Sequence, residues 1–168
     1  LHKTVVNDCV ALNQKLLKET PSLAAFAKEA SVATIKQTLP AVTCTVQSTY
    51  LTGKTPDKTG IVGNGWYFKD EAEIKFWRQS NMLVGGEKLW ERLKAKNSRF
   101  TCANLFWWYN MYSKVDYSIT PRPMYTSDGR KIPDIYTKPA DLRSKVQKEL
   151  GTFPLFSFWG PATSIRSS

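Results

Sequence analysis

The sequence lacks the features that mark several large classes of protein. No apolar run approaches the roughly 18 residues that a membrane-spanning helix requires, so no membrane partner is expected. The three cysteines, Cys9, Cys44 and Cys102, are far apart without a Cys-x-x-Cys pair, and His2 is the one histidine. A disulfide framework and a zinc finger are therefore not expected. We expect three small buried thiols in a reducing compartment.

Several catalytic sequence motifs are absent as well. The chain contains no Gly-x-Ser-x-Gly elbow, no Walker lysine motif and no glycine fingerprint for dinucleotides, which argues against the enzyme classes built on those motifs. Residues 1–12 are too short and too polar for a signal peptide, and this favours a cytoplasmic location. The chain begins at Leu1 rather than at a methionine and ends at Ser168 without a terminal signal, so we expect it to be part of a longer protein.

Positive charge is abundant. The 168 residues include 24 Lys and Arg against 14 Asp and Glu, which gives a formal net charge of +10. Such a charge favours an anionic partner, and nucleic acid is one alternative. The basic residues are interspersed with acidic ones, as in "EKLWERLKAK", a pattern typical of solvated helix faces. A small phosphorylated substrate is therefore the preferred partner. The composition indicates little about the oligomeric state.

The hydrophobic pattern predicts alternating strands and helices. Strands are expected at residues 3–12, 32–39, 100–108 and 152–161. Helices are expected at residues 20–31, 44–51, 85–97 and 138–151, and a hairpin around the Asp128-Gly129 turn. Apolar spacing in the helices predicts that Phe26, Leu89 and Trp90 face inward. The alternation indicates one α/β domain over residues 1–168, with a mainly parallel sheet flanked by helices.

Three polar residues occupy positions where such a fold binds ligands. Asp8 comes just after the "TVVN" of the first expected strand, and ligands of α/β sheets lie beyond the carboxyl ends of the strands. Thr43 comes at the start of an expected helix, where N–H groups and the helix dipole favour negative charge. Asn64 lies between two glycines. Each also has an ordinary interpretation: a helix cap for the threonine, a turn or cap residue for the aspartate, and a left-handed turn for the asparagine.

The order and spacing of these residues carry more information than their types. Asp8 follows "TVVN", "TPSL" opens the next helix, "TCTVQSTYLTG" begins with Thr43, and "GIVGN" ends with Asn64. Together these motifs resemble the type I phosphodiesterase/nucleotide pyrophosphatase family of the alkaline phosphatase superfamily. The resemblance is specific from Asp8 to about Tyr67, and it is general from there to the end of the chain.

The resemblance implies a role for each of the three residues. Thr43 would be the nucleophile and a metal ligand, and Asn64 would donate its amide to a phosphoryl oxygen in the transition state. Asp8 would be a ligand in a site for two divalent metal ions, which we expect to be zinc. Water would then hydrolyse the phosphothreonine. Asp8 precedes a cysteine where the family usually has glycine, so the neighbouring Asn7 and Asn13 remain alternatives for this position.

The resemblance also implies a fold and an activity. We expect an alkaline-phosphatase-like fold and a metal-dependent hydrolase of phosphodiester or pyrophosphate bonds in nucleotides or related organophosphates. Residues 1–168 would be the N-terminal part of the catalytic domain, and the domain would be incomplete. The family's remaining ligands, aspartates and histidines, lie further along the chain, so these 168 residues alone are expected to be inactive. The alternatives are a non-catalytic α/β module that binds anions and a truncated fragment.

Aromatic and basic residues supply further candidates. Trp66 and Tyr67 follow the "GNG" stretch closely and are candidates for stacking on a base or an apolar leaving group. Packing in the core is the alternative for both. The proline-rich segment with Arg122, Arg130 and Lys131 is predicted to pass over the mouth of the site, with its cations facing anions. An ordinary surface hairpin is the alternative for that segment.

Overall fold

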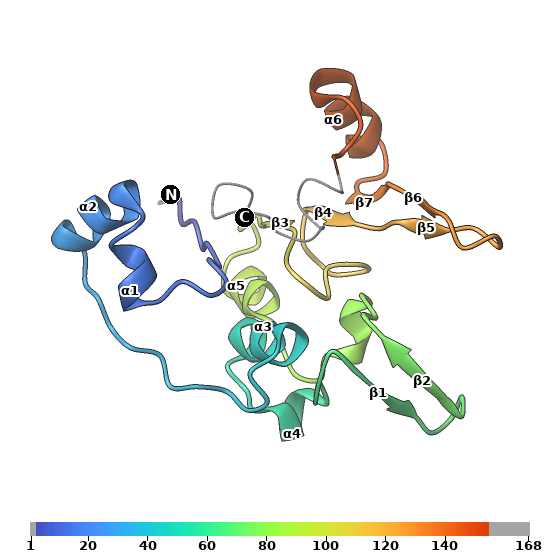
Figure 1. The fold of residues 1–168 in the computed structure, drawn as a ribbon, viewed down its shortest axis with the longest axis horizontal. Helices are drawn as coiled ribbons and strands as arrows, with labels where there is room; N and C mark the ends of the chain where they lie inside the picture. The colour runs from blue at the N-terminus through green and yellow to red at the C-terminus, as the bar shows by residue number, and fades with distance from the viewer. Residues whose placement is uncertain (1–2, 155–168) are drawn as a thin grey trace. The chain divides into compact units, whose positions relative to one another are not determined.

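The computed structural model describes residues 3–154, and it contains both helices and strands (Figure 1). The chain divides into two compact units, Leu1–Lys36 and Gln37–Ser168. The helices of the described part are α1 Gln14–Leu17, α2 Pro21–Glu29, α3 Thr43–Thr52, α4 Pro56–Thr59, α5 Leu89–Lys96 and α6 Leu142–Leu150, with a 3-10 turn η1 at Asn81–Leu83. Its strands are β1 Gly65–Phe68, β2 Glu73–Phe76, β3 Ala103–Leu105, β4 Tyr117–Pro121, β5 Met124–Tyr125, β6 Lys131–Ile132 and β7 Ile135–Lys138. The protein is therefore of the mixed α/β class.

The first unit contains two short helices with different starts. Helix α1 begins after Asn13, whose side-chain oxygen accepts hydrogen bonds from the N–H groups of Lys15 and Leu16 at 2.9 and 3.1 Å. Helix α2 has Pro21 at its first position. Thr20 precedes that proline, but its hydroxyl donates to the carbonyl of Leu17 at 2.9 Å instead of capping α2. The helix expected at residues 20–31 is confirmed, and its start has no side-chain cap.

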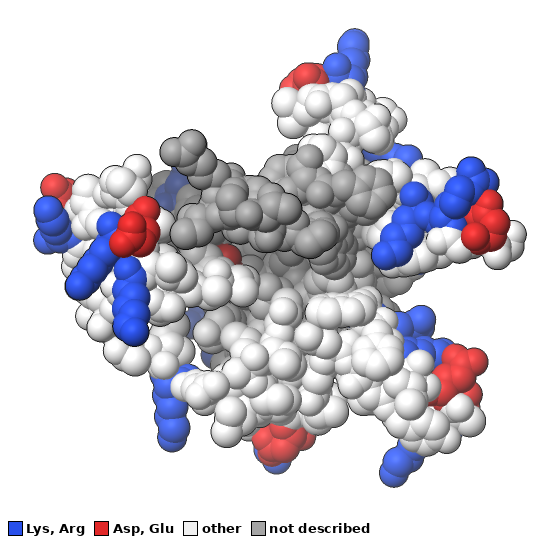
Figure 2. All heavy atoms as spheres, in the orientation of Figure 1, with Lys and Arg blue, Asp and Glu red and all other residues white. Residues whose placement is uncertain are grey.

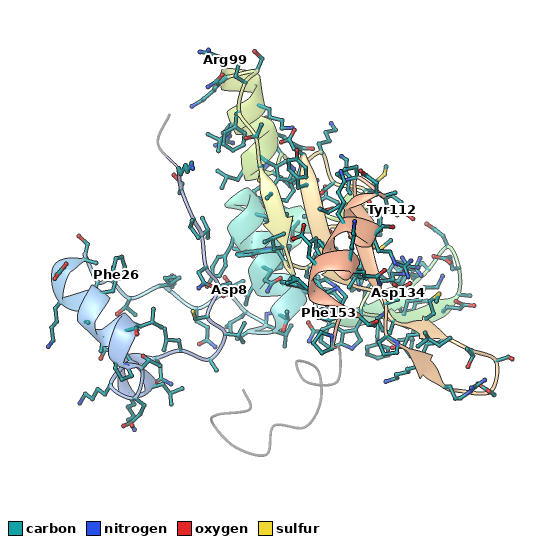
Figure 3. All side chains as sticks on the ribbon, turned by 90° about the horizontal axis from the view of Figure 1, so that it is seen from above. Asp8, Phe26, Arg99, Tyr112, Asp134 and Phe153 are labelled. Atoms are coloured by element: carbon teal, nitrogen blue, oxygen red, sulfur yellow. The ribbon has the colours of Figure 1, made fainter. Side chains whose placement is uncertain are left out.

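Two predicted strands of the first part of the chain do not form among the described residues. Residues 3–12 and 32–39 have no strand partner in the described part of the chain, and Val5 and Ile35 are 89% and 70% exposed. The predicted buried face of α2 is also wrong for Phe26, which is 69% exposed (Figure 3). An apolar run becomes a strand only where a neighbouring strand completes its backbone hydrogen bonds, and an amphipathic face is buried only where an element packs against it.

The helices of the second unit follow the sequence predictions closely. Helix α3 ends at Gly53, which adopts the left-handed conformation with φ of 67° that glycine allows without strain. Helices α5 and α6 also lie within their predicted ranges. In α5, Trp90 is buried as predicted, at 4% exposure, but Leu89 is exposed. Leu89 is the first residue of α5, and it faces solvent although the adjacent Trp90 faces the core.

The strands of the second unit form three small sheets. β1 pairs with β2, and β5 pairs with β6, in both cases antiparallel. β4 lies between β3, to which it is parallel, and β7, to which it is antiparallel. The predicted mainly parallel sheet is not confirmed among residues 3–154, where β3 and β4 are the one parallel pair of strands. The predicted hairpin at Asp128-Gly129 explains part of this result, because a tight turn permits only antiparallel pairing.

Two apolar clusters form the core of the second unit. The first consists of Cys44, Ile61, Val84, Trp108 and Tyr109. The second consists of Leu51, Trp90 and Val115. Helix α3 contributes Cys44 near its start and Leu51 near its end, so packing holds both ends of the helix. The position of its N-terminus is therefore fixed by the core.

Three remaining predictions concern cysteines, membranes and the last strand. The three cysteines are free, as predicted, but Cys9 is exposed and Cys102 half-buried, so burial holds for Cys44 alone. In the part of the chain that the structure describes, no helix has the length and apolar character needed to cross a bilayer. Residues 152–154 form no strand, and the rest of the predicted strand at 152–161 lies outside the described residues.

Candidate functional site

Thr43 is the first residue of α3, and its hydroxyl is not used to cap the helix. The N-cap position belongs to Val42, which has extended backbone and no oxygen in its side chain. Among the described residues, the Thr43 hydroxyl has no hydrogen-bond partner, and the side chain is half-buried. The interpretation of Thr43 as an ordinary cap is therefore wrong. Its hydroxyl lies at the helix N-terminus, where the dipole stabilises negative charge.

The other hydroxyls of α3 are used differently. Those of Ser48 and Thr49 donate to the carbonyl of Thr45 at 2.9 and 3.0 Å, and that of Thr52 donates to the carbonyl of Ser48 at 2.8 Å. Such bonds satisfy the hydroxyls within the helix and leave them unavailable for other partners. The hydroxyls of Ser48, Thr49 and Thr52 therefore serve the helix itself. Those of Thr43 and Thr45 have no hydrogen-bond partner among the described residues, and of these two Thr45 is fully buried whereas Thr43 is half-buried.

Asn64 is bound directly to the start of α3. Its Oδ1 accepts a hydrogen bond from the backbone N–H of Cys44 at 2.9 Å. Because a backbone N–H can only donate, the atom that faces Cys44 is the amide oxygen, and the NH₂ group of Asn64 points elsewhere. Asn64 does not adopt the left-handed conformation, so the alternative of a left-handed turn residue is wrong. The predicted pair Thr43 and Asn64 is thus brought together by one bond to the residue that follows Thr43.

The backbone of Asn64 is held by a hydrogen bond as well. The Asn64 carbonyl accepts a hydrogen bond from the N–H of Trp77 at 2.8 Å. Trp77 has a φ of 54°, which is strained for a bulky residue and persists only where surrounding contacts hold it. At Gly65, an added Cβ would come within 2.2 Å of the Phe76 ring. This glycine therefore allows β2 to pack closely beside Asn64.

Trp66 and Tyr67 do not share a face. They are neighbours on β1, so their side chains point to opposite sides of the strand. Trp66 is half-buried, packs against the first core cluster and stacks on Phe68 with ring centroids 4.9 Å apart. Tyr67 is 54% exposed. Trp66 therefore packs in the core, which was the alternative to a role in ligand binding. Tyr67 is exposed enough to contact a ligand.

Asp8 belongs to the first unit, and Thr43 and Asn64 belong to the second. Asp8 is half-buried on the extended segment that precedes α1 (Figure 3). Among the described residues, no three His, Cys, Asp or Glu side chains lie together in a way that suits a metal ion. The described residues therefore do not by themselves fit the two-metal site that the sequence resemblance implies.

The sequence did not indicate the residues that fix the N-terminal part of α3 in the core. Cys44 is fully buried, and burial raises the pKa of its thiol to about 11, so it is neutral at physiological pH. One turn further along α3, the Gln47 side chain accepts a hydrogen bond from the backbone N–H of Trp108 at 2.7 Å. The distance between Gln47 and Trp108 in the sequence explains the omission, because no local pattern indicates such a pair.

The basic segment forms the predicted hairpin, and each of its three cations contacts a different kind of partner. Arg130 is 79% exposed and pairs with Asp128 at 2.6 Å. Arg122 donates to the sulfur of Met111 at 2.9 Å, and Lys131 lies 5.5 Å from the centre of the Tyr125 ring. Figure 2 shows basic and acidic side chains together over the β5–β6 hairpin. Arg130 thus has the character of an ordinary surface residue, whereas Arg122 and Lys131 do not pair with a carboxylate.

Comparison with known proteins identifies the family. A family model described as type I phosphodiesterase / nucleotide pyrophosphatase matches residues 8–168. The chain therefore belongs to this family, as the motifs around Thr43 and Asn64 predicted. No curated protein and no solved structure gives a match.

Proposed function

We propose that the chain carries the nucleophile of a metal-dependent hydrolase that cleaves phosphodiester or pyrophosphate bonds. Membership of the type I phosphodiesterase/nucleotide pyrophosphatase family supports the reaction class. Thr43 is proposed as the nucleophile and Asn64 as the residue that stabilises the transition state. The substrate is proposed to be a nucleotide or a related small organophosphate.

One observation carries the assignment of these two residues: the 2.9 Å hydrogen bond from the Cys44 N–H to Asn64 Oδ1. The bond places Asn64 at the N-terminus of α3, where Thr43 has a hydroxyl with no partner among the described residues. It also fixes the amide so that the NH₂ group is left to donate elsewhere. A nucleophile and a hydrogen-bond donor beside a helix N-terminus suit a reaction in which negative charge develops on phosphoryl oxygens.

The proposed chemistry follows from these groups. Thr43 Oγ1 attacks phosphorus and the bond to the leaving oxygen breaks, which gives a covalent ester of Thr43 that water then hydrolyses. The NH₂ group of Asn64 donates to a phosphoryl oxygen, and the N-terminus of α3 stabilises the negative charge there. A neutral amide suits a diester, which carries less charge than a monoester.

The metal dependence is a separate part of the proposal. A bound divalent metal lowers the pKa of a hydroxyl that it coordinates, and this is the chemistry that a threonine nucleophile needs. Asp8 and Thr43 are proposed as two of the ligands, with zinc as the metal. Since the described residues contain no three-residue metal cluster, the proposal requires ligands from outside them. For the same reason residues 1–168 are proposed to be the N-terminal part of one catalytic domain and inactive alone.

The substitution Thr43→Ala in the full-length protein tests the nucleophile. We expect turnover of bis(4-nitrophenyl) phosphate to fall by about 10³-fold or more, because the substitution removes the hydroxyl that is proposed to form the covalent ester. Thr43→Ser should retain part of the activity. The matched control is Thr49→Ala on the same helix, whose hydroxyl donates to a helix carbonyl; it should stay within a few-fold of the original rate.

Two results separate this proposal from the alternatives. Turnover that is unchanged in Thr43→Ala, with metal content also unchanged, would contradict the nucleophile assignment. A full-length protein that binds phosphate but shows no zinc-dependent turnover would instead be the anion-binding module. A nucleic-acid binder would show a steep salt dependence of binding to any DNA or RNA.

A further inference from the structure

The second unit contains a surface pocket whose lining includes neither Thr43 nor Asn64. Its volume is about 770 Å³, within the roughly 300–1,000 Å³ range of small-molecule sites. The wall residues that matter most are three cations and three aromatic residues: Arg78, Arg122, Lys131, Trp77, Trp108 and Tyr125. They come from the segment after β2, from the hairpin β4–β7 and from the loop after β3. Residues far apart in the sequence therefore converge on one cavity.

The charges of this pocket are of one sign. No Asp or Glu of the described residues lines it, while Arg78, Arg122 and Lys131 do. All three are exposed, and none forms an ion pair with another described residue. Arg130 on the same hairpin, by contrast, pairs with Asp128. Three unpaired cations around one cavity without a carboxylate favour an anionic ligand.

The aromatic walls add a second requirement. Trp77 and Trp108 meet edge to face, with ring centroids 5.3 Å apart, and the Trp108 indole N–H donates to the Arg78 carbonyl at 2.9 Å. Their ring faces are therefore set in place before any ligand binds. Lys131 lies 5.5 Å from the centre of the Tyr125 ring. Cations beside fixed aromatic surfaces suit a planar ring that carries an anionic group.

The pocket is joined to the proposed reaction site by two hydrogen bonds. Trp77 N–H donates to the Asn64 carbonyl at 2.8 Å, and Trp108 N–H donates to the Gln47 side chain at 2.7 Å. Gln47 lies one turn after Thr43 on α3. Both tryptophans of the wall are thus anchored to the elements that carry the nucleophile and the amide.

We propose that this pocket binds an aromatic ring that bears a phosphate or carboxylate group, as the leaving-group part of the substrate. The recognition of an aromatic anion is inferred from the cations and aromatic rings of the pocket alone. Its assignment to the leaving group rests on the proposed function. The substrate is then a phosphodiester or pyrophosphate whose leaving group is both aromatic and anionic, and Arg78, Arg122 and Lys131 determine that specificity.

The first test measures binding without turnover, by calorimetry on the full-length protein carrying Thr43→Ala. The probes are phenyl phosphate, benzene-1,3-dicarboxylate, phenol and inorganic phosphate. We expect at least one of the two aromatic anions to bind about tenfold or more tightly than both phenol and inorganic phosphate, because it uses charge and ring together. The better of the two identifies the anionic group. Equal affinity for inorganic phosphate and both aromatic anions would overturn the proposal.

Substitutions locate that binding. Arg122→Met should lower the affinity for the aromatic anion about tenfold, because a charge-assisted contact is lost. Arg122→Lys should retain part of that affinity. The matched control is Arg130→Met on the same hairpin, which removes an equal charge outside the pocket and should leave affinity unchanged. Equal losses in the Arg122 and Arg130 variants would show a diffuse charge effect and would overturn the pocket. Thermal unfolding of each variant confirms that it is folded.

The second test concerns the leaving group and uses the protein with Thr43 intact. The substrates are methyl 4-carboxyphenyl phosphate and methyl 4-nitrophenyl phosphate, which differ in the charge of the leaving group. Arg122→Met should lower kcat/KM for the carboxyphenyl ester about tenfold more than for the nitrophenyl ester. An equal loss would overturn the leaving-group assignment. If instead Thr43→Ala keeps full turnover, the proposed function fails, while the calorimetric result on the pocket still stands.

Discussion

The two compact units of the chain contain similar apolar residues but use them differently. In the first unit Val5 and Phe26 are 89% and 69% exposed. In the second, Cys44 and Trp90 are at most 4% exposed and belong to two core clusters. An apolar pattern therefore predicts burial only where the surrounding chain supplies a surface to bury against.

The same difference separates the proposed functional residues. Thr43 and Asn64 lie in the second unit, where α3 packs at both ends and a hydrogen bond joins Asn64 to the residue after Thr43. Asp8 lies in the first unit, on a segment without regular structure. The residues proposed as nucleophile and amide donor are positioned by a core, whereas Asp8 belongs to neither core cluster of the described residues.

The comparison of packing is tested first by two matched truncations. Trp90→Ala should lower the free energy of unfolding by about 3–5 kcal/mol, because it removes a large buried side chain from the second cluster. Phe26→Ala should change it by no more than about 0.5 kcal/mol, because its ring is mostly exposed. Urea unfolding of the full-length variants measures both. Similar losses would mean that Phe26 is buried in the full-length protein, and the contrast between the units would fail.

The second prediction tests whether Asn64 acts through its amide. Asn64→Asp keeps an oxygen for the Cys44 N–H but loses the NH₂ donor, so folding should be retained while turnover falls by about 10²–10³-fold. Asn64→Ala removes both groups and should also lower stability by about 1 kcal/mol or more, because the Cys44 N–H loses its partner. Kinetics and thermal unfolding separate the two effects. Full activity in Asn64→Asp would rule out the amide as a donor.

The third prediction asks whether the first unit contributes to the reaction site. Loss of a residue that only hydrogen-bonds to a metal ligand lowers metal affinity by about 10–100-fold. Asp8 is proposed as a direct ligand, so Asp8→Asn should lower zinc affinity by at least that factor. The control is Asp70→Asn, an exposed carboxylate in the turn between β1 and β2. Zinc bound per full-length chain is measured by elemental analysis after dialysis. Equal zinc content in both variants would remove Asp8 from the ligand set and would favour its neighbours Asn7 and Asn13.

The fourth prediction compares one thiol from each unit. Burial raises the pKa of Cys44 to about 11, so at pH 9 only about 1% of it is the reactive thiolate. Iodoacetamide should therefore modify exposed Cys9 at least about tenfold faster, as peptide mass spectrometry will show. Because the folded pKa lies above the ordinary thiol value near 9, the stability tied to this group is present below pH 9 and is lost as the pH rises towards 11. Similar rates at pH 9 would contradict the burial of Cys44.

The sequence predicted the local features better than the long-range ones. The ranges of α3 and α6 and the turn at Asp128-Gly129 follow from patterns within a few residues. The direction of strand pairing was not predictable in the same way, because it depends on which segments meet. Contacts such as Gln47 with Trp108 depend on the assembled core, and no local signal marks them.

The candidate site shows the same division. The motif around Thr43 and Asn64 indicated the family, and the family match over residues 8–168 confirms that interpretation. The motif did not indicate how the two residues meet, which is through the backbone N–H of Cys44. It also did not predict that Trp66 and Tyr67 would point to opposite sides of β1, since no strand was expected at these residues.

The central claim is that Thr43 forms a covalent bond to phosphorus, and one measurement tests it directly. The full-length protein is mixed with bis(4-nitrophenyl) phosphate, quenched with acid during turnover, digested and analysed by mass spectrometry. We expect the peptide that contains Thr43 to gain the phosphoryl group with its one remaining nitrophenyl ester, and fragmentation to place it on Thr43. Label on another residue, or ongoing turnover with no label on Thr43 in samples quenched throughout the reaction, would contradict the account.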